Sequence, residues 1–422
     1  MRYQDELTSH LSSNHRVTPG AARASEKGAL SSQHTSVKGV SGNKESANAP
    51  TALGIFPKAV RGFLVEVSFI YTTPIYVGLV LLVWGLTSCS STIGPTPYAI
   101  PTPQDFIEMV IPPDNPTTVE GVELGRTLFF DPILSVDNTI SCASCHRPEL
   151  AFTDGAAVSS GLVGRKGRRS APSLLNVGFH YKSVFWDGRS ASLEEQALHP
   201  LSDSLEMGNN WNQIEQQLQS NSGYKTLFEA AFPGEAISKA NTANALAQFQ
   251  RTLISADSKY DRVQRGEASF TTQEQRGWTI FFDAGYPTVP MAECNHCHMD
   301  PLFTNLGFAN TGLDSSATLL DFPDPGLGAI TGNKYDNGKF RVPTLRNILV
   351  TAPYMHDGRM SHINDVIEHY NCGGAYAENV DPNVRSLHLS DQDKADLLAF
   401  LSTLTDSTAL YNPNYYPFTT DD

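Results

Sequence analysis

Two short motifs in this 422-residue chain bring two cysteines and a histidine together within five positions. Both read Cys-x-x-Cys-His: the first is Cys142, Cys145 and His146, and the second is Cys294, Cys297 and His298. This spacing lets two thiols bond to the vinyl groups of one porphyrin while the histidine ligates its iron. A zinc site or a redox dithiol is the alternative. We expect two covalently attached haem c groups, with His146 and His298 as proximal iron ligands.

The residues around the two motifs repeat. Gly-Arg-Thr-Leu-Phe-Phe-Asp at 125–131 recurs as Gly-Trp-Thr-Ile-Phe-Phe-Asp at 277–283, and the first motif cysteine follows eleven residues after each Asp. Further along, Ala-Pro-Ser-Leu-Leu-Asn at 171–176 corresponds to Val-Pro-Thr-Leu-Arg-Asn at 342–347. Such repetition indicates two copies of one fold. We expect a mainly α-helical protein with two cytochrome c-like haem domains that arose by internal duplication.

Helical periodicity dominates the chain after the first 100 residues, and no convincing alternating strand run is present. Helices are expected before each haem motif, the first at 121–130, and over 192–198, 211–218, 240–255, 363–370 and 390–403. Long Gly/Pro-rich loops lie between them, notably at 321–332. The predicted organisation is a linker at 89–103, haem domains at 104–265 and 266–408, and a tail at 409–422.

The first 88 residues differ from the rest in composition. Residues 1–60 lack a hydrophobic period, which favours disorder or a mis-started leader. Residues 61–88 combine a basic flank with an apolar stretch, and the chain continues into Cys89 through Leu-Thr-Ser-Cys, which resembles a bacterial lipoprotein signal. An uncleaved membrane anchor is the alternative. Either reading places the haem domains in the periplasm or on the outer cell surface, tethered to a membrane, with a lipid on Cys89 in the first case.

The charge of the chain argues against a nucleic-acid partner. After Ser88 it carries 22 basic and 39 acidic residues, a net charge of −17. A strongly acidic surface repels polyanions and suits a small basic redox protein.

From about residue 104 to residue 405, the sequence resembles the bacterial di-haem cytochrome c peroxidases and their MauG relatives. The resemblance rests on Ser-Cys-Ala-Ser-Cys-His (141–146), Ala-Phe-Thr-Asp-Gly (151–155), Phe-Trp-Asp-Gly-Arg (185–189), Arg-Val-Pro-Thr-Leu-Arg-Asn (341–347) and Thr-Ala-Pro-Tyr-Met-His-Asp-Gly (351–358). It implies that the first haem reduces hydrogen peroxide to water with electrons from a small c-type cytochrome or cupredoxin. Alternatives are a MauG-like oxidation of aromatic residues in a partner protein, and electron transfer without turnover. A homodimer is left open.

The resemblance also assigns residues to the peroxide site. Gln196 and Glu206 follow Trp186 by ten and twenty residues, the family's spacing, and Pro200 matches a pocket-lining proline. Glu206 is implied to move protons to and from peroxide, and Gln196 to hold the peroxide oxygen by hydrogen bonding. A solvated helix face is the alternative for both. Trp186 is implied to lie between the haems as an electron relay, with a core aromatic as the alternative.

One departure from the peroxidase pattern concerns the first haem. Many relatives carry a histidine in the loop after the first motif, and it blocks the peroxide haem until the other haem is reduced. Residues 156–172 contain no histidine. Unless His180 or His199 substitutes, the first haem is expected to be open at rest.

The other departure concerns the second haem. The peroxidases place a Met ligand seventeen residues after the Pro of the Thr-x-Pro element, and counting from Pro353 gives Tyr370, as in MauG-type members. A Tyr ligand lowers the haem potential relative to Met. His369 and Met360 are the rival ligands. Cys372 has no partner among the remaining cysteines and is expected to be a bystander thiol.

A calcium ion between the domains is a further implication of the resemblance. Its ligands would be the backbone carbonyls of Thr351 and Pro353 and a side chain at Ser170, where the family has Asn. Carbonyl and hydroxyl oxygens suit calcium, but Ser170 lacks the amide oxygen that Asn supplies.

Overall fold

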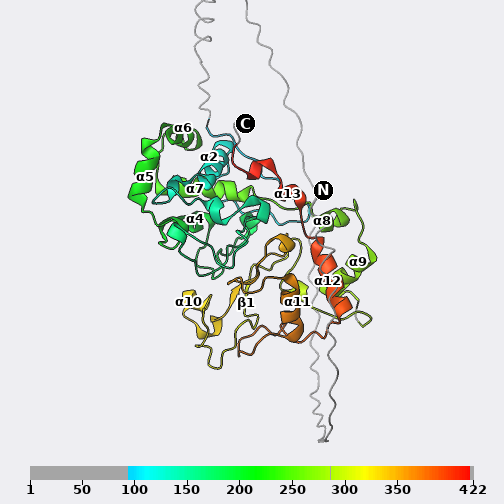
Figure 1. The fold of residues 1–422 in the computed structure, drawn as a ribbon. Helices are drawn as coiled ribbons and strands as arrows, with labels where there is room; N and C mark the ends of the chain where they lie inside the picture. Colours follow the sequence, from blue (N-terminus) through cyan, green and yellow to red (C-terminus); the bar gives the residue numbers. More distant parts are fainter. Residues whose placement is uncertain (1–93, 286, 419–422) are drawn as a thin grey trace, which may run out of the picture. The chain divides into compact units, whose positions relative to one another are not determined.

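The computed structural model describes residues 94–285 and 287–418, all within the unit Cys89–Asp422 (Figure 1). The predicted leader at 1–60, the signal at 61–88 and Cys89 lie outside the described residues. In the described part, no helix is both long and apolar enough to cross a membrane. The architecture is mainly helical, as the sequence predicts.

Short helices joined by extended loops make up the described chain. The α-helices are α2 (Val119–Phe130), α3 (Cys142–Cys145), α4 (Leu193–Ser202), α5 (Trp211–Ser220), α6 (Ser222–Ala231), α7 (Lys239–Arg251), α8 (Lys259–Gln264), α9 (Thr272–Phe281), α10 (Gly328–Thr331), α11 (Ile363–Cys372), α12 (Asp391–Ser402) and α13 (Ser407–Leu410). A 3-10 helix, η5 (Cys294–His296), carries part of the second haem motif. The sheet in these residues is the antiparallel pair β1 (Phe308–Ala309) and β2 (Phe340–Arg341).

Helix α2 packs against α7 in the first half of the described chain. The Thr118 hydroxyl accepts a hydrogen bond from the Gly121 amide and so caps the start of α2. Gly125 lies where the helices cross, because a Cβ there would come within 2.0 Å of the Ala245 carbonyl oxygen. This close approach brings the fully buried Leu128 into the first core.

Helices α9 and α12 form a matching pair in the second half. Thr271 and Glu274 build a capping box at the start of α9. A Cβ on Gly277 would come within 1.9 Å of the Asp396 carbonyl oxygen on α12. Gly277 stands at the same place in the sequence repeat as Gly125, so both halves use a glycine at the same helix crossing.

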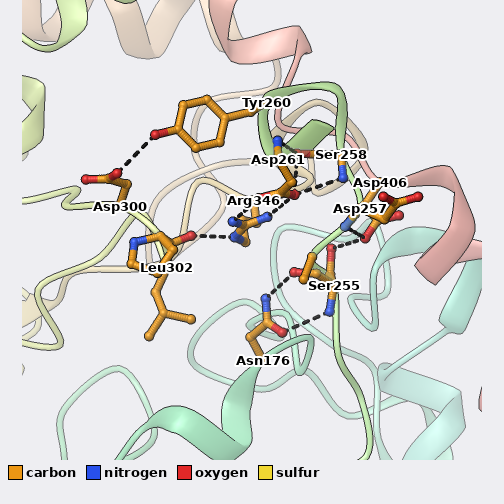
Figure 2. A network of polar contacts seen from close by, with 12 residues as sticks. Asn176, Ser255, Asp257, Ser258, Tyr260, Asp261, Asp300, Leu302, Arg346 and Asp406 are labelled. Atoms are coloured by element: carbon orange, nitrogen blue, oxygen red, sulfur yellow. Dashed lines mark hydrogen bonds and ion pairs between the residues drawn. The ribbon is translucent and has the colours of Figure 1, made fainter. Parts of the chain in front are cut away.

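Two asparagines in the left-handed conformation meet at Ser255. Asn176 (φ 62°) donates its amide to the Ser255 carbonyl at 2.8 Å and accepts from the Ser255 N–H at 2.9 Å (Figure 2). Asn347 (φ 59°) donates to the Ser255 hydroxyl at 3.0 Å, and that hydroxyl donates to Asp406 at 3.0 Å. Asparagine tolerates this backbone region better than most residues. The last residues of the repeated segments 171–176 and 342–347 are therefore both hydrogen-bonded to Ser255.

A buried ion pair lies beside this junction (Figure 2). Arg346, which is 1% exposed, donates to both carboxylate oxygens of Asp261 at 2.7 and 2.8 Å and to the Pro301 carbonyl at 2.6 Å. Ser258 donates to Asp261 through its amide at 2.9 Å and its hydroxyl at 2.7 Å. Desolvated charges are tolerated only when they are paired in this way.

The apolar core divides between the two halves. The first cluster includes Leu124, Leu128, Phe129, Phe152 and Phe249, and the second includes Ile280, Phe281, Phe303, Ile367 and Phe400. Ala409, Leu410 and Tyr415 belong to the first cluster, although they come after the second. The Tyr415 hydroxyl donates to the Ile254 carbonyl at 3.0 Å and accepts from the Ile254 amide at 2.9 Å. The predicted tail is therefore packed, as far as residue 418, against the first half.

Some element boundaries differ from the predictions. Helix α7 ends at Arg251, four residues early, because Thr252 closes it and donates its hydroxyl to the Phe249 carbonyl at 2.7 Å. The loop predicted at 321–332 contains α10, and helices α6 and α8 were not predicted. The strands β1 and β2 are two residues long, too short to give an alternating pattern.

Candidate functional site

The first Cys-x-x-Cys-His motif forms α3, where the Ser144 hydroxyl accepts a hydrogen bond from the Ser141 amide. His146 ends the helix, and its Nδ1 lies 2.8 Å from the Phe152 carbonyl oxygen. A carbonyl only accepts, so Nδ1 carries the proton and the Nε2 lone pair is left for a metal. Neither cysteine is in a disulfide, and burial raises the pKa of Cys142 to about 12. These groups fit covalent attachment and proximal ligation of a haem.

The second motif supports its histidine in the same way. The Nδ1 of His298 lies 3.0 Å from the Phe303 carbonyl oxygen. Burial lowers the pKa of His298 to about 4, so the imidazole is neutral at pH 7, as iron ligation requires. Cys294 and Cys297 are likewise in no disulfide. The histidines of both motifs are therefore oriented by a backbone carbonyl a few residues further on.

A large, mainly apolar cavity opens beside the second motif. The space between its walls, part of it open to solvent, is about 2040 Å³. The lining includes the motif residues Cys294, Cys297 and His298 and the apolar side chains of Phe281, Ile348, Ile363, Ile367 and Leu401. An apolar chamber with two thiols and one neutral imidazole fits a covalently bound porphyrin.

Among the three predicted candidates for the second distal ligand, Tyr370 is the one that lines this cavity. His369 turns away, with its Nε2 2.9 Å from the Thr311 carbonyl oxygen. Met360 packs against the second core and is not part of the cavity lining. Cys372 is exposed at the end of α11 and donates to Glu368 at 3.3 Å, away from the cavity.

Glu206 lies close enough to the first motif to influence its thiols. Burial raises the pKa of Cys142 and Cys145, and the Glu206 charge adds to both increases. Burial also raises the pKa of Glu206 itself, with the Asp203 charge adding to the rise and Arg189 opposing it. Its carboxylate makes no hydrogen bond to any residue that the structure describes. The site therefore holds a half-buried carboxyl group with its oxygens uncommitted.

The loop after the first motif positions Glu206. Within this loop, the Leu162 amide donates a hydrogen bond to the Glu206 backbone carbonyl at 2.9 Å. A Cβ on Gly161 would come within 2.0 Å of the Leu205 carbonyl oxygen, so only glycine allows this contact. Gln196 is half-buried on α4, and its side-chain amide is likewise without a hydrogen bond in the described chain. Pro200, inside the same helix, accepts from the Met207 amide through its carbonyl at 3.2 Å.

His180 is not available as a distal ligand in this conformation. Its Nδ1 lies 2.8 Å from the Arg341 Nη1, and a guanidinium only donates, so Nδ1 accepts. Burial and the Arg341 charge lower the pKa of His180 well below its ordinary value, so the ring is neutral and Nε2 holds the proton. Neither nitrogen then offers a lone pair to iron. His199 is exposed on α4 and packs edge-on against Phe185, with ring centroids 5.6 Å apart.

Trp186 belongs to the first half of the chain but lines the cavity of the second motif. Its indole Nε1 donates to the Ser170 carbonyl at 2.9 Å, and its own carbonyl accepts from the Arg341 amide at 2.8 Å. Ser170 in turn donates its amide to the His356 carbonyl at 2.8 Å. Trp186 is thus held at both its ring and its backbone.

An ion-pair cluster beside Trp186 was not predicted from the sequence. Arg169 donates to Asp187 at 2.5 Å and makes two bonds to Asp324 at 2.7 and 2.8 Å. Although burial opposes it, the Arg169 guanidinium lowers the pKa of both carboxyl groups. Asp187 lies in a family motif, whereas Asp324 lies in the Gly/Pro-rich loop, where no local pattern marked it. Met355 also lines the cavity, although the sequence pattern did not predict a role for it.

The three predicted calcium-binding positions, Ser170, Thr351 and Pro353, line the same cavity. The Ser170 hydroxyl donates to the carbonyls of Met355 at 3.1 Å and His356 at 3.3 Å. Oxygen atoms are therefore gathered here, but these three positions supply no carboxylate and no side-chain amide. The fit to calcium is accordingly weak.

Comparison with known proteins gives consistent matches. The family described as di-haem cytochrome c peroxidase matches residues 119–269. The methylamine utilization protein MauG of Methylophilus methylotrophus is 34% identical over 296 residues, which cover 69% of this chain and 84% of that protein. Cytochrome c551 peroxidase of Pseudomonas aeruginosa is 33% identical over 272 residues, covering 63% and 75% respectively.

Solved structures agree with these matches. A MauG-like protein associated with microbial copper homeostasis has a TM-score of 0.69 and 38% identity, covering 76% of this chain and 99% of that one. The diheme peroxidase BthA from Burkholderia thailandensis has a TM-score of 0.59 at 23% identity, covering 78% of this chain and 99% of that one, and shares the fold. Family members are oxidoreductases, and the di-haem family implies two haem c cofactors. Two haem motifs on matching supports and this set of relatives lead to one conclusion: the chain belongs to the di-haem cytochrome c peroxidase and MauG family.

Proposed function

We propose that the protein is a cytochrome c peroxidase that reduces hydrogen peroxide to water with electrons from a small redox protein. One haem c is attached at Cys142 and Cys145 and the other at Cys294 and Cys297. When bound, the haems supply the redox chemistry that passes electrons from the donor to peroxide. Each hydrogen peroxide takes two electrons and two protons to become two waters, so the chain must also handle protons.

Glu206 is the residue that we assign to this proton handling, and the observation that carries the proposal is its setting. It is a carboxyl group beside the first haem motif, its pKa is raised mainly by burial, and it has no hydrogen bond in the described chain. A carboxylate with a raised pKa accepts a proton from peroxide and returns it to the departing oxygen more readily than a solvated one. Gln196 would orient the peroxide through its free amide.

Trp186 is proposed as the electron relay between the two haems. It is anchored on Ser170 and lines the cavity of the second motif, and an aromatic ring in that position shortens the path for an electron. Tyr370 is proposed as the distal ligand of the second haem, since it lines that cavity and its rivals do not.

A MauG-like oxidation of aromatic residues in a partner protein is the second candidate. Two observations favour it. Tyr370 stands where a peroxidase-type Met is expected. In His180, Nδ1 accepts from Arg341 and Nε2 carries the ring proton, so neither nitrogen offers a lone pair to block the first haem. Electron transfer without turnover is the third candidate, and it needs no role for Glu206.

One experiment separates the three. Stoichiometric hydrogen peroxide is added to the purified diferric protein, the spectrum is followed, and reduced cytochrome c is then supplied. Rapid multiple-turnover oxidation of the cytochrome supports the peroxidase. A long-lived oxidised state of the protein, without cytochrome turnover, supports the MauG-like activity. Absence of any reaction with peroxide contradicts both and leaves an electron-transfer cytochrome.

We also propose that the two halves, 104–265 and 266–408, descend from a duplication. The paired glycine crossings, the paired asparagines at Ser255 and the paired histidine supports are consistent with it. We further propose a periplasmic location with a lipid on Cys89, supported by the lipoprotein-like segment before Cys89 and by the attachment of c-type haem after export. Calcium at Ser170, Thr351 and Pro353 remains a prediction, to be checked by metal analysis of the purified protein before and after chelation.

A further inference from the structure

Arg341 differs from the other deeply buried arginines of the described chain. Arg251, Arg341 and Arg346 are 3%, 4% and 1% exposed. Arg346 is paired with Asp261, and Arg251 with Glu194. Arg341 forms no ion pair with any carboxylate in residues 94–285 or 287–418. A guanidinium without an anion is costly to bury, so its partner must come from elsewhere.

The contacts that Arg341 does make are to neutral groups. Its Nε donates to the Phe185 carbonyl at 3.1 Å, and its Nη1 donates to the His180 Nδ1 at 2.8 Å. Its other terminal nitrogen, Nη2, has no acceptor among the residues that the structure describes. Burial lowers the pKa of Arg341 to about 10, so the side chain is still a cation at pH 7.

The unmatched charge lies on the wall of the haem cavity. Arg341 lines the same cavity as Cys294, Cys297 and His298. Its place is fixed by the sheet, where it pairs with Phe308 on β1. A haem brings two carboxylates, its propionates, and a guanidinium is well suited to bind a carboxylate.

We propose that Arg341 binds a propionate carboxylate of the haem attached at Cys294 and Cys297, with the Nε2–H of His180 as a second donor. This rests on haem attachment at the second motif and not on the peroxidase activity. Because the Arg341 amide also donates to the Trp186 carbonyl, the residue that holds the haem carboxylate also positions the proposed relay.

The test uses the holoprotein with both haems, in the variants Arg341→Met and Arg341→Lys. Arg385→Met is the matched control, because Arg385 lines the same cavity but is 44% exposed and paired with Glu293 at 2.6 Å. Haem content per chain is measured first, so that a failure of attachment is seen separately. Spectroelectrochemical titration then gives the potential of each haem, and resonance Raman spectra report the propionate bending modes.

Loss of the cation favours the ferric haem. We expect Arg341→Met to lower the reduction equilibrium constant of the second haem about tenfold, which is about 59 mV for one electron. Arg341→Lys should change the potential of the second haem little, because the positive charge is kept. It should still shift the propionate bending mode, because a single ammonium replaces the planar guanidinium with its two parallel donors. The control, Arg385→Met, should change the potential of the second haem and the propionate bending mode far less.

Three results would overturn the proposal. The first is an unchanged potential and an unchanged propionate mode in Arg341→Met. The second is a shift confined to the first haem. The third is a control effect as large as that of Arg341→Met. If Arg341→Met fails to mature, the propionate mode of Arg341→Lys decides, and an unchanged mode there contradicts the proposal.

Discussion

The two haem motifs are supported alike and surrounded differently. In each, the histidine Nδ1 is bonded to a backbone carbonyl, at 2.8 Å for His146 and 3.0 Å for His298. Beyond the histidine the likeness ends. The first motif has a carboxyl group, Glu206, near its thiols, whereas the cavity of the second is lined by the phenol of Tyr370. The same backbone support therefore orients the motif histidine in both sites, and the groups on the other side of each site differ.

The largest effect is expected from removing the carboxylate that sets the first site apart. Glu206→Gln should slow the reaction with peroxide by about 10²- to 10⁴-fold, the usual contribution of a general acid–base group. Stopped-flow spectroscopy of the diferric protein measures this rate. Glu229→Gln, an exposed carboxylate on α6, is the control. Equal rates for the Glu206 variant and the parent would contradict the assigned role.

The junction between the halves gives the next largest effect. Arg346→Met leaves the Asp261 carboxylate buried without a cation and should cost about 3–5 kcal/mol of unfolding free energy. Denaturant unfolding followed by circular dichroism measures the change. Arg265→Met breaks exposed ion pairs with Glu267 and Asp257 and should cost far less, because solvent screens surface pairs. Similar losses in both variants would show that the junction pair has no special role.

Exchanging the distal group of the second site tests the other side of the comparison. Tyr370→Met should raise the potential of the second haem by on the order of 100 mV, a fraction of the roughly 0.8 V that axial ligands span. A Met thioether favours the ferrous iron more than a phenolate does. The exposed Tyr376→Met is the control, with Tyr376 75% exposed. A potential that stays at the parent value would mean that Tyr370 is not a ligand.

The smallest effect is a pH dependence at the first site alone. The pKa of Glu206 is raised above its ordinary value near 4.5, mainly by burial, and in our proposal the ionised form accepts the proton of peroxide. The rate should therefore fall as the pH drops through the raised pKa, by a few-fold over the first unit. In Glu206→Gln, the fall of the rate at low pH should disappear from the pH–rate profile. If the rate of the variant still falls at low pH, the titrating group is a residue other than Glu206.

Sequence reasoning reached most of the local features and few of the long-range ones. The haem motifs, the helix at Ile363–Cys372 and the position of Tyr370 follow from spacing along the chain. Arg341, Asp324 and the packing of Tyr415 do not, because each acts through a contact with a residue far away in sequence. No periodicity or turn signal marks a buried arginine that has no acid near it. Its partner is also not an amino acid in our proposal, so the sequence alone could not have named it.

The packing of the last described segment bears on the order in which the protein matures during its synthesis. The first core includes Ala409, Leu410 and Tyr415, which are synthesised after the whole of the second half. A nascent chain that has emerged only as far as the first haem motif therefore cannot complete the core around it. We therefore expect the first motif to stay incompletely enclosed, and its cysteines accessible for haem attachment, until residues 409–415 have been synthesised. Removing residues 409–418 should consequently damage the first site, although the cut is made at the far end of the chain.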